Sequence, residues 1–378
     1  MARVLVVMNT PHIPATSGYS QRVSAVINAL EAAGHTVQTI SIKPLTASGA
    51  FNWRSRISVL LKLLRTPSLS LLKWYSPKAC DAIHKTIKVW EPEVVILESS
   101  YLAPYRALFK CPVIFDLHNV ESQLISNYAK DRAGIVGKVA QIESRLLERL
   151  EAAIPHHADG IATVSETDRQ TLNQLGQSAM VKVLAAPNGV NDEAFAVADD
   201  LANSKAPTAV FIGHLGWRPN IDGAKWLANS VWPLVHAQIP NARLQLIGRD
   251  PDHTVRELAN PKQGITVHGN VASVFPYLSQ AAVATAPLWT AGGTRLKILE
   301  ALGTATPVVA TSLGALGLES LARNQVLTIC DEPADFANAL VHYLLNPAKS
   351  APAREAAEAF RWSNTLTGLI DLVNDAVK

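Results

Sequence analysis

The pattern of apolar and polar positions divides the chain into two similar series of elements. The first series begins with the apolar run 4–8, which predicts a buried strand, followed by a loop, a helix over 21–33 and a strand over 36–42. A second series begins with the apolar run 209–213, again followed by a loop and a helix. Continuous apolar strands that alternate with helices predict an α/β protein with two doubly wound, Rossmann-like domains that face each other across a cleft.

Further apolar runs predict the other strands of both series. They lie at 93–98, 112–117, 160–164 and 181–184, and then at 244–248, 265–268, 282–286, 307–310 and 326–330. Helices are predicted over 142–158, from the N-cap Ser165 to 175, from about residue 222, over 295–302 and over 350–378.

A segment with little apolar periodicity, 192–207, separates the two series and is interpreted as a linker. The predicted domains are therefore residues 1–195 and residues 206–355. The C-terminal helix, about 357–378, is expected to pack back on the first domain.

Composition narrows the class of protein. With 378 residues, of which 48% are hydrophobic, the chain can form two or more domains with sizeable cores. A net charge of +3 is too small to indicate a nucleic-acid partner. Cys80, Cys111 and Cys330 are widely spaced and form no zinc pattern, which indicates a reducing compartment. The N-terminal strand breaks at Pro11, no signal peptide is recognised, and no apolar run spans a bilayer, so a cytoplasmic location is expected.

Residues 53–90 combine basic side chains with apolar residues at helical spacing. One acid, Asp81, stands against eight basic residues, which are Arg54, Arg56, Lys62, Arg65, Lys73, Lys78, Lys85 and Lys88. One interpretation is a basic amphipathic surface that lies on an anionic membrane, which would make the protein peripheral at the inner membrane face. The alternative is a solvated basic face on helices whose apolar side packs in the core.

A glycine loop opens a helix in the second series. The loop 292–294 (Gly-Gly-Thr) precedes a run of strong helix formers that begins at Arg295. Helix N-termini bind anions, and Arg295 and Lys297 place two cations at an end where the dipole alone disfavours them. This combination indicates a diphosphate, and Glu300, two turns on, is suited to two vicinal hydroxyls of a ribose. An ordinary loop and helix with a polar start is the alternative.

Polar residues also follow strands of the first series. Gly18 and Arg22 lie after the first strand, and Arg22 is within reach of an anion there. His118, Asn119 and Glu121 follow the strand 112–117. The carboxyl ends of parallel strands are where ligands bind in such sheets, so both groups are site candidates. A simple turn at Gly18 and a structural role for His118 are the alternatives.

Familiar motifs of other enzyme classes are missing. No G-x-G-x-x-G follows the first strand, which disfavours a nicotinamide dehydrogenase, and no G-x-x-x-x-G-K-[ST] is present, which disfavours a P-loop NTPase. No G-x-S-x-G elbow occurs either. Two domains with one substrate each fit the pattern better.

Short motifs occur in one order over nearly the whole chain. They are the loop at Gly18, FDLHNVES, TVSETD, APNGV, VFIGHLGWRPN, LQLIGRDP, VHGNV and PLWTAGGTRLKILEALGTATPVVAT. The ordered set resembles the retaining glycosyltransferases of family 4, which have the GT-B fold. The GGTRLKILEAL form is most similar to a bacterial branch associated with cell-surface polysaccharide synthesis.

The resemblance implies a retaining, metal-independent hexosyltransferase without a cofactor. Its donor would be a nucleotide-diphospho-sugar, UDP- or GDP-linked, bound by residues 206–355. Its acceptor, bound by residues 1–195, would be a glycan, a lipid-linked saccharide or a small molecule. The alternatives are a nucleotide-sugar epimerase on the same fold and a non-catalytic protein that binds sugar nucleotides. The second alternative is kept open by Gly292, which stands where the family has the first glutamate of its E-x7-E pattern.

The resemblance also implies roles for individual residues. Catalytic roles fall to His118 beside the transferred sugar and to Arg295 and Lys297 at the leaving diphosphate, with no metal site. The implied donor-binding residues are Gly18, His214, Gly269, Asn270, Val271, Gly292, Gly293, Thr294, Leu296 and Glu300. The residues expected near the acceptor are Arg22, Asn119, Glu121 and Asn188.

Overall fold

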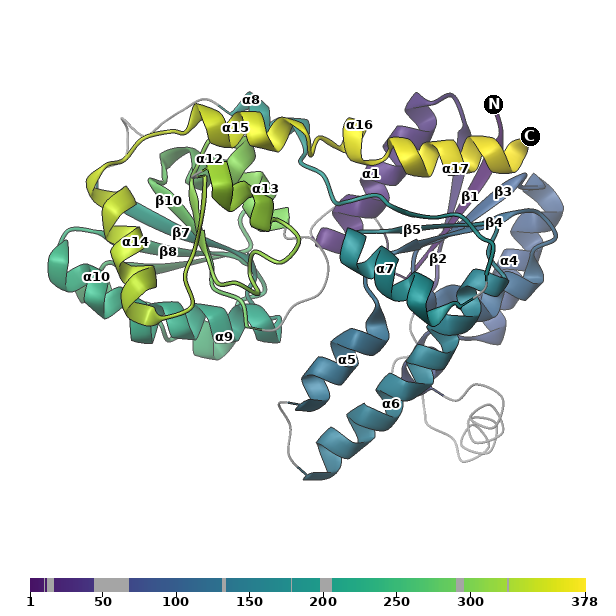
Figure 1. Ribbon diagram of the computed structural model, residues 1–378, viewed down its shortest axis with the longest axis horizontal. Coiled ribbons are helices and arrows are strands. Elements are labelled where there is room, and N and C mark those ends of the chain that lie inside the picture. The colour runs from purple at the N-terminus through teal and green to yellow at the C-terminus, as the bar shows by residue number, and fades with distance from the viewer. Residues whose placement is uncertain are drawn as a thin grey trace. The chain divides into compact units, whose positions relative to one another are not determined.

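The computed structural model describes residues 1–9, 11, 17–43, 68–130, 134–177, 179–197, 206–289, 296–324 and 326–378. Contacts divide the chain into two compact units, Met1–Pro187 with Leu366–Lys378 (unit 1) and Asn188–Thr365 (unit 2). Each unit contains a parallel six-stranded sheet covered by helices (Figure 1). The predicted fold class of two doubly wound α/β sheets is confirmed.

The sheet of unit 1 has the order β2-β1-β3-β4-β5-β6. Its strands are β1 (Arg3–Met8), β2 (Thr36–Ser41), β3 (Val94–Leu97), β4 (Val113–Leu117), β5 (Gly160–Thr163) and β6 (Val183–Ala185). The strands β3, β4 and β5 are buried along their whole length, as their continuous apolar sequences require of strands covered on both faces. The chain order reverses beside β1, so the crevice at the carboxyl ends of β1 and β3 is the topological switch point of this sheet.

Helices cover this sheet and also extend beyond it. They are α1 (Gly18–Ala32), α3 (Leu69–Trp74), α4 (Pro77–Trp90), η1 (Ser100–Leu108), α5 (Glu121–Lys130), α6 (Gly134–Ala153), η2 (Ile154–His156), α7 (Glu166–Leu175) and α17 (Thr367–Val377). The helices α5 and α6 pack on each other and extend away from the sheet (Figure 1). The last helix, α17, packs on β3, β5 and β6.

The sheet of unit 2 has the order β12-β11-β10-β7-β8-β9. Its strands are β7 (Thr208–His214), β8 (Arg243–Arg249), β9 (Ile265–Gly269), β10 (Val283–Ala286), β11 (Val308–Ala310) and β12 (Leu327–Ile329). The chain order reverses beside β7, so the switch point of this sheet lies at the carboxyl ends of β7 and β10.

Two apolar clusters fill the space between this sheet and its helices, one on each face. The helical segments are α8 (Asp192–Ala196), α9 (Arg218–Trp226), η4 (Leu227–Val231), α10 (Trp232–Gln238), α11 (His253–Arg256), η5 (Pro261–Gln263), α12 (Phe275–Gln280), α13 (Leu296–Gly303), η6 (Glu319–Asn324), α14 (Pro333–Leu345), α15 (Ala351–Glu358) and α16 (Trp362–Thr365). The helix α13, which packs against β10 and β11, belongs to the segment expected to bind a diphosphate.

Several predicted elements differ from the observed ones. The segment interpreted as a linker contains the helix α8, because Ala194 is buried in the apolar cluster of unit 2. The helix α5 was not predicted, and α6 begins at Gly134 rather than near residue 142. The helix α9 begins at Arg218, earlier than expected, and the helical C-terminal region consists of the three helices α15, α16 and α17.

Candidate active site

Three acidic and basic side chains meet at the carboxyl edge of the sheet in unit 1. Glu98 follows β3 directly, Asp116 lies within β4, and His118 follows β4. The strands pair in parallel, with Leu97 opposite Phe115, so the residues that follow lie side by side. The Nε2 atom of His118 is 2.9 Å from Oε2 of Glu98 and 3.7 Å from Oδ2 of Asp116.

Asp116 is held by a buried ion pair with Arg22 of α1. The Nε and Nη2 atoms of Arg22 donate to the two carboxylate oxygens of Asp116 at 2.8 and 2.6 Å, and Nη1 donates to the carbonyl of Ala186 at 2.8 Å. Arg22 and Asp116 are both 0% exposed. The expectation that Arg22 binds a ligand anion is therefore wrong, because its guanidinium faces the interior and neutralises Asp116.

His118 is mostly buried, with 12% of its side chain exposed, and its ring lies 4.7 Å from that of Tyr19. The pKa of His118 is lowered to about 4, mainly by burial; the charge of Asp116 opposes this shift and the charge of Arg22 adds to it. The imidazole is therefore neutral over the physiological pH range. A neutral ring with one edge exposed can hydrogen-bond a sugar oxygen without adding a charge.

Glu98 is a site residue that the sequence analysis did not identify. It is 0% exposed, and burial, followed by the charge of Asp116, raises its pKa well above the ordinary value. The sequence did contain one indication of this site residue. Glu98 ends the apolar run 93–98, so its carboxyl group directly follows a strand that is buried on both faces. Asp116 gave a similar signal, since a carboxylate inside an apolar strand requires a partner.

The other candidates of unit 1 lie around this cluster. Gly18 is the exposed first residue of α1, whose N-terminus is capped by Ser17. Asn119 Nδ2 donates to Glu121 Oε1 at 3.4 Å, and Tyr101 Oη donates to Glu121 Oε2 at 2.9 Å. Burial raises the pKa of Glu121, although these hydrogen bonds act in the opposite direction. Asn188 is half-buried and begins unit 2.

The cluster of Glu98, Asp116 and His118 has the residue types of a metal site. One ligand atom from each lies within 4.8 Å of the others. However, Arg22 occupies both carboxylate oxygens of Asp116, so a metal ion would lie beside a fixed positive charge and would compete for the same oxygens. The residues therefore fit an internal hydrogen-bonded cluster better than a metal site.

In unit 2 a lysine lies at the switch point of the sheet. Lys297 of α13 donates from Nζ to Oδ1 of Asn220 at 2.8 Å, and the same atom lies 4.3 Å from the ring centroid of Phe211 in β7. Asn220, 3% exposed, donates from Nδ2 to the carbonyl of His214 at 2.9 Å. Asn220 was not identified from the sequence, and its role here is to hold the ammonium group of Lys297 at the carboxyl end of β7.

Other donor-site candidates gather at the ends of β7, β8 and β9. His214 Nε2 is 3.6 Å from Oδ2 of Asp250, and burial lowers the pKa of His214, as does the charge of Arg249. Asn270 has φ of 56° and accepts from the backbone N–H of Asp250 at 2.9 Å. Gly269 is exposed at the end of β9, and Val271 packs partly against the apolar cluster.

Glycines let these strand ends approach closely. A Cβ atom at Gly248 would lie 1.6 Å from the carbonyl oxygen of Gly213, so only glycine fits at this position. Because β7 and β8 pair closely here, His214 and Arg249 lie opposite each other at the edge of the sheet. The edge therefore offers backbone groups and several polar side chains to a ligand.

The helix α13 carries the remaining donor candidates. Glu300 is 8% exposed, so its carboxylate is largely covered, and Leu296 at the start of the helix is half-buried. Arg295 and the loop residues Gly292, Gly293 and Thr294 lie outside the described residues. Their predicted roles stay predictions.

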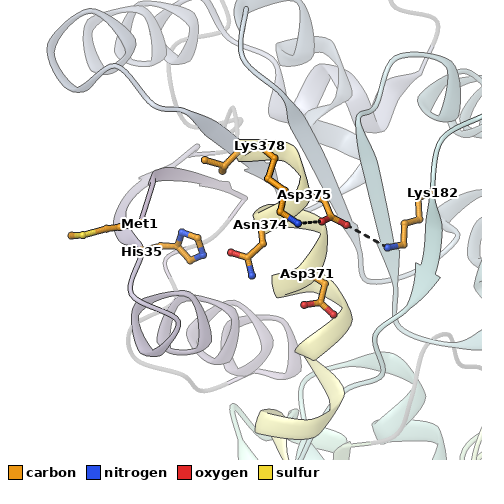
Figure 2. A pocket seen from close by; sticks show the side chains of 8 residues that line it. Met1, His35, Lys182, Asp371, Asn374, Asp375 and Lys378 are labelled. Carbon is orange, nitrogen blue, oxygen red and sulfur yellow. Dashed lines mark hydrogen bonds and ion pairs between the residues drawn. The ribbon is translucent and has the colours of Figure 1, made fainter.

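A pocket of about 590 Å³ lies at the opposite edge of the sheet in unit 1 (Figure 2). Met1, His35 and Lys182 precede the strands β1, β2 and β6, and α17 contributes Asp371 and Asp375. Asp375 pairs with Lys182 at 3.8 Å. Because the pocket is at the amino ends of the strands, it is separate from the cluster around His118.

Two family models match the chain in the order that the sequence motifs predict. Residues 17–189 match a model described as a glycosyl transferase 4-like domain, and residues 206–346 match one described as glycosyl transferases group 1. Together the matches cover most of the chain. The protein belongs to the group 1, family 4-like glycosyltransferases, which are retaining enzymes that transfer a sugar from a nucleotide sugar. No curated protein matches the chain.

Solved structures share the fold over the full length. Sucrose-phosphate synthase from Thermosynechococcus elongatus is 20% identical with a TM-score of 0.72, and the match covers 99% of each chain. Anabaena HepE in complex with UDP-glucose is 15% identical with a TM-score of 0.66, covering 99% of this chain and 100% of that one. A UDP-forming trehalose-phosphate synthase from Burkholderia xenovorans, in complex with glucose-6-phosphate, is 13% identical with a TM-score of 0.63, and the match covers 100% of both chains. At these identities the likeness shows the fold alone.

Proposed function

We propose that the protein is a metal-independent hexosyltransferase that uses a UDP-linked sugar, with the donor bound by unit 2 and the acceptor by unit 1. The observation that carries the proposal is the ammonium group of Lys297, which Asn220 holds at the switch point between β7 and β10. A fixed cation at the carboxyl end of a parallel sheet is suited to a diphosphate. The complex of Anabaena HepE with UDP-glucose supports a uridine donor.

In the proposed mechanism, charge on the departing diphosphate is stabilised by Lys297, together with Arg295 and the amides of 292–294. Stabilisation of developing charge by preorganised groups is usually the largest single contribution to catalysis. His118, neutral and partly exposed, orients the transferred sugar through a hydrogen bond. Transfer with retention then occurs on the face of the sugar that the diphosphate leaves, and the donor phosphate accepts the proton of the acceptor hydroxyl.

Nucleotide binding tests the donor assignment. We expect UDP and UDP-glucose to raise the melting temperature, while GDP and ADP have smaller effects. A ligand at about 100 times its Kd stabilises the native state by roughly 2.7 kcal/mol, which differential scanning fluorimetry detects. Glu300→Ala should abolish the UDP shift, because the carboxylate assigned to the ribose hydroxyls is lost.

The matched control for this test is Glu319→Ala, which removes an exposed carboxylate of the same unit at the start of η6. This variant should keep the full UDP shift. An equal shift with wild type and Glu300→Ala would remove Glu300 from the ribose site. No shift with any nucleotide would contradict the donor assignment itself and favour a non-catalytic role.

We further propose that the acceptor is a growing glycan or a lipid-linked saccharide of a cell-surface polysaccharide, and that the cytoplasmic protein works at the inner membrane face. Within the described residues, no helix is long and apolar enough to cross a membrane. Residues 53–67 of the predicted basic surface lie outside the described part, but α4 contributes the exposed residues Lys78, Lys85 and Lys88.

A second surface supports the membrane contact. On α6, Ile135 is 81% exposed and Ile142 is 58% exposed, and with Val139 they form one apolar stripe at i, i+4 and i+7. The exposed residues Lys138 and Arg145 lie on the same helix. Apolar side chains beside cations are typical of helices that bind anionic lipid surfaces.

Vesicle binding tests the membrane contact. The double variant Ile135→Ser with Ile142→Ser should bind vesicles of anionic phospholipid at least about tenfold more weakly than wild type, because the apolar area inserted into the interface is lost. Co-sedimentation measures this, and added salt should weaken wild-type binding. Leu345→Ser, which changes an exposed apolar residue of α14 in unit 2, serves as the control. Unchanged binding of the double variant would exclude α6 from the contact.

A further inference from the structure

The end of β3 places a carboxyl group directly behind His118. Oε2 of Glu98 contacts Nε2 of the histidine at 2.9 Å, and Glu98 is 0% exposed. Its second oxygen, Oε1, is buried and has no hydrogen-bond partner among the described residues. An ionised carboxylate with a buried unpartnered oxygen is strongly disfavoured, so this environment favours the protonated acid.

After burial, the largest effect on the pKa of Glu98 comes from the charge of Asp116, which raises it, while the charge of Arg22 acts in the opposite direction. Arg22 of α1 and Asp116 of β4 neutralise each other through two hydrogen bonds. His118 is neutral because burial lowers its pKa to about 4, and the pKa of Glu121, at the start of α5, is raised by burial. An ionised Glu98 would therefore add an uncompensated negative charge to a buried cluster, which agrees with its raised pKa.

The other ring nitrogen of His118 is open to a ligand. Nδ1 makes no hydrogen bond within the described part of the chain and is not among its buried unpartnered atoms. The hydrogen-bonding role of Nδ1 depends on which atoms of the Glu98–His118 pair carry protons, because the ring nitrogen that faces Glu98 sets the tautomer.

We propose that Glu98 is a positioning residue of the transfer reaction, which keeps a proton on the Glu98–His118 pair and thereby fixes Nδ1 of His118 as a hydrogen-bond donor. When the acid is protonated, its O–H donates to Nε2, and the neutral ring carries its hydrogen on Nδ1. If the proton moves to Nε2, Nδ1 still carries its hydrogen. Only when the pair loses this proton does Nε2–H donate to the carboxylate, which leaves Nδ1 as an acceptor.

This assignment rests on the proposed place of His118 beside the transferred sugar, and it predicts a pH dependence. The pKa of Glu98 is raised in the folded protein. Below this pKa the Glu98–His118 pair keeps its proton and Nδ1 is a hydrogen-bond donor. As the pH rises through the pKa of Glu98, the pair loses the proton and Nδ1 becomes an acceptor. Transfer should therefore fall on the alkaline side. Glu98→Gln keeps an N–H donor to Nε2 that cannot ionise, so this alkaline fall should disappear.

Two measurements on the full chain test the inference. In ¹⁵N NMR of histidine-labelled protein, His118 should carry hydrogen on Nδ1 near neutral pH in wild type and Glu98→Gln. Glu98→Gln should retain transfer within about fivefold, without the alkaline fall. Glu98→Leu, which leaves Nε2 without a partner, should lower kcat about 100-fold with little change in KM, because the ring is no longer held in its working geometry.

Glu143→Gln is the matched control, since Glu143 is also buried in unit 1 but accepts from Ser68 and Ser70 instead of His118. It should keep the wild-type pH profile, and thermal unfolding confirms that each variant is folded. A His118 ring that carries hydrogen on Nε2 and none on Nδ1 near neutral pH in the wild type, or an unchanged alkaline fall in Glu98→Gln, would overturn the inference. Full transfer by His118→Ala would instead contradict the proposed function, whatever tautomer the NMR spectrum shows.

Discussion

Lys297→Met should lower kcat for sugar transfer by about 10²–10³-fold, which corresponds to roughly 3–4 kcal/mol of transition-state stabilisation. Methionine keeps the apolar stem but removes the ammonium group that Asn220 Oδ1 accepts from at 2.8 Å. If this cation stabilises the leaving diphosphate, the loss should appear mainly in kcat, because charge on the diphosphate develops in the transition state. Initial rates with saturating UDP-sugar measure the effect.

A matched control separates a local effect from a general loss of positive charge. Lys262→Met removes an exposed lysine of the same unit in η5, and it should keep wild-type kinetics. Unfolding curves of both variants should resemble that of the wild type. If Lys297→Met retained more than about half of the wild-type kcat, Lys297 would have no role in charge stabilisation.

Arg22→Met should destabilise unit 1 by about 3–5 kcal/mol, because it removes one partner of a buried ion pair. The carboxylate of Asp116 would then be buried without its two guanidinium hydrogen bonds, and beside a second acid, Glu98. The carbonyl of Ala186 would also lose a donor. Urea denaturation measures the free energy of unfolding, and the fluorescence of Trp74 and Trp90 reports on unit 1, which contains both.

The double variant Arg22→Met with Asp116→Leu provides the control for this prediction. Replacement of both charges by apolar groups of similar size is often nearly neutral, so much of the lost stability should return. A double variant as unstable as Arg22→Met alone would show that packing of the arginine, and not the unpaired charge, is responsible. A stable Arg22→Met protein would contradict the ion-pair argument altogether.

The sequence correctly predicted the helices, strands and caps that are specified by residues close together in the chain. Apolar runs located the strands to within a few residues, and Ser165 was correctly expected to cap α7, where its hydroxyl accepts from the N–H of Asp168 at 3.0 Å. The order of motifs predicted the family that the two models then showed. Strands buried on both faces carry an unusually clear signal, because nearly every position in them is apolar.

The sequence did not predict features that depend on contacts between residues far apart in the chain. Arg22 was expected to face a ligand, but it pairs with Asp116, which is 94 positions away in the chain. The helix α5 has a buried partner at its N-terminus, where Glu151 of α6 accepts from the N–H of Glu121 at 2.6 Å. Such pairings are set by the tertiary fold, so local propensity and periodicity do not reveal them.

Unit 1 is discontinuous in the chain, and this has a consequence for biosynthesis. The helix α17 packs tightly on its sheet, since a Cβ atom at Gly160 would lie 3.3 Å from Leu372 and one at Gly368 would lie 3.3 Å from Leu184. The ribosome makes β6 long before α17, and at about 5–20 residues per second the sequence of unit 2 between them takes roughly ten seconds or more. During that time the apolar surface that α17 covers is open to chaperones and to aggregation. The nascent chain should therefore complete unit 2 before unit 1, although unit 1 contains the N-terminus.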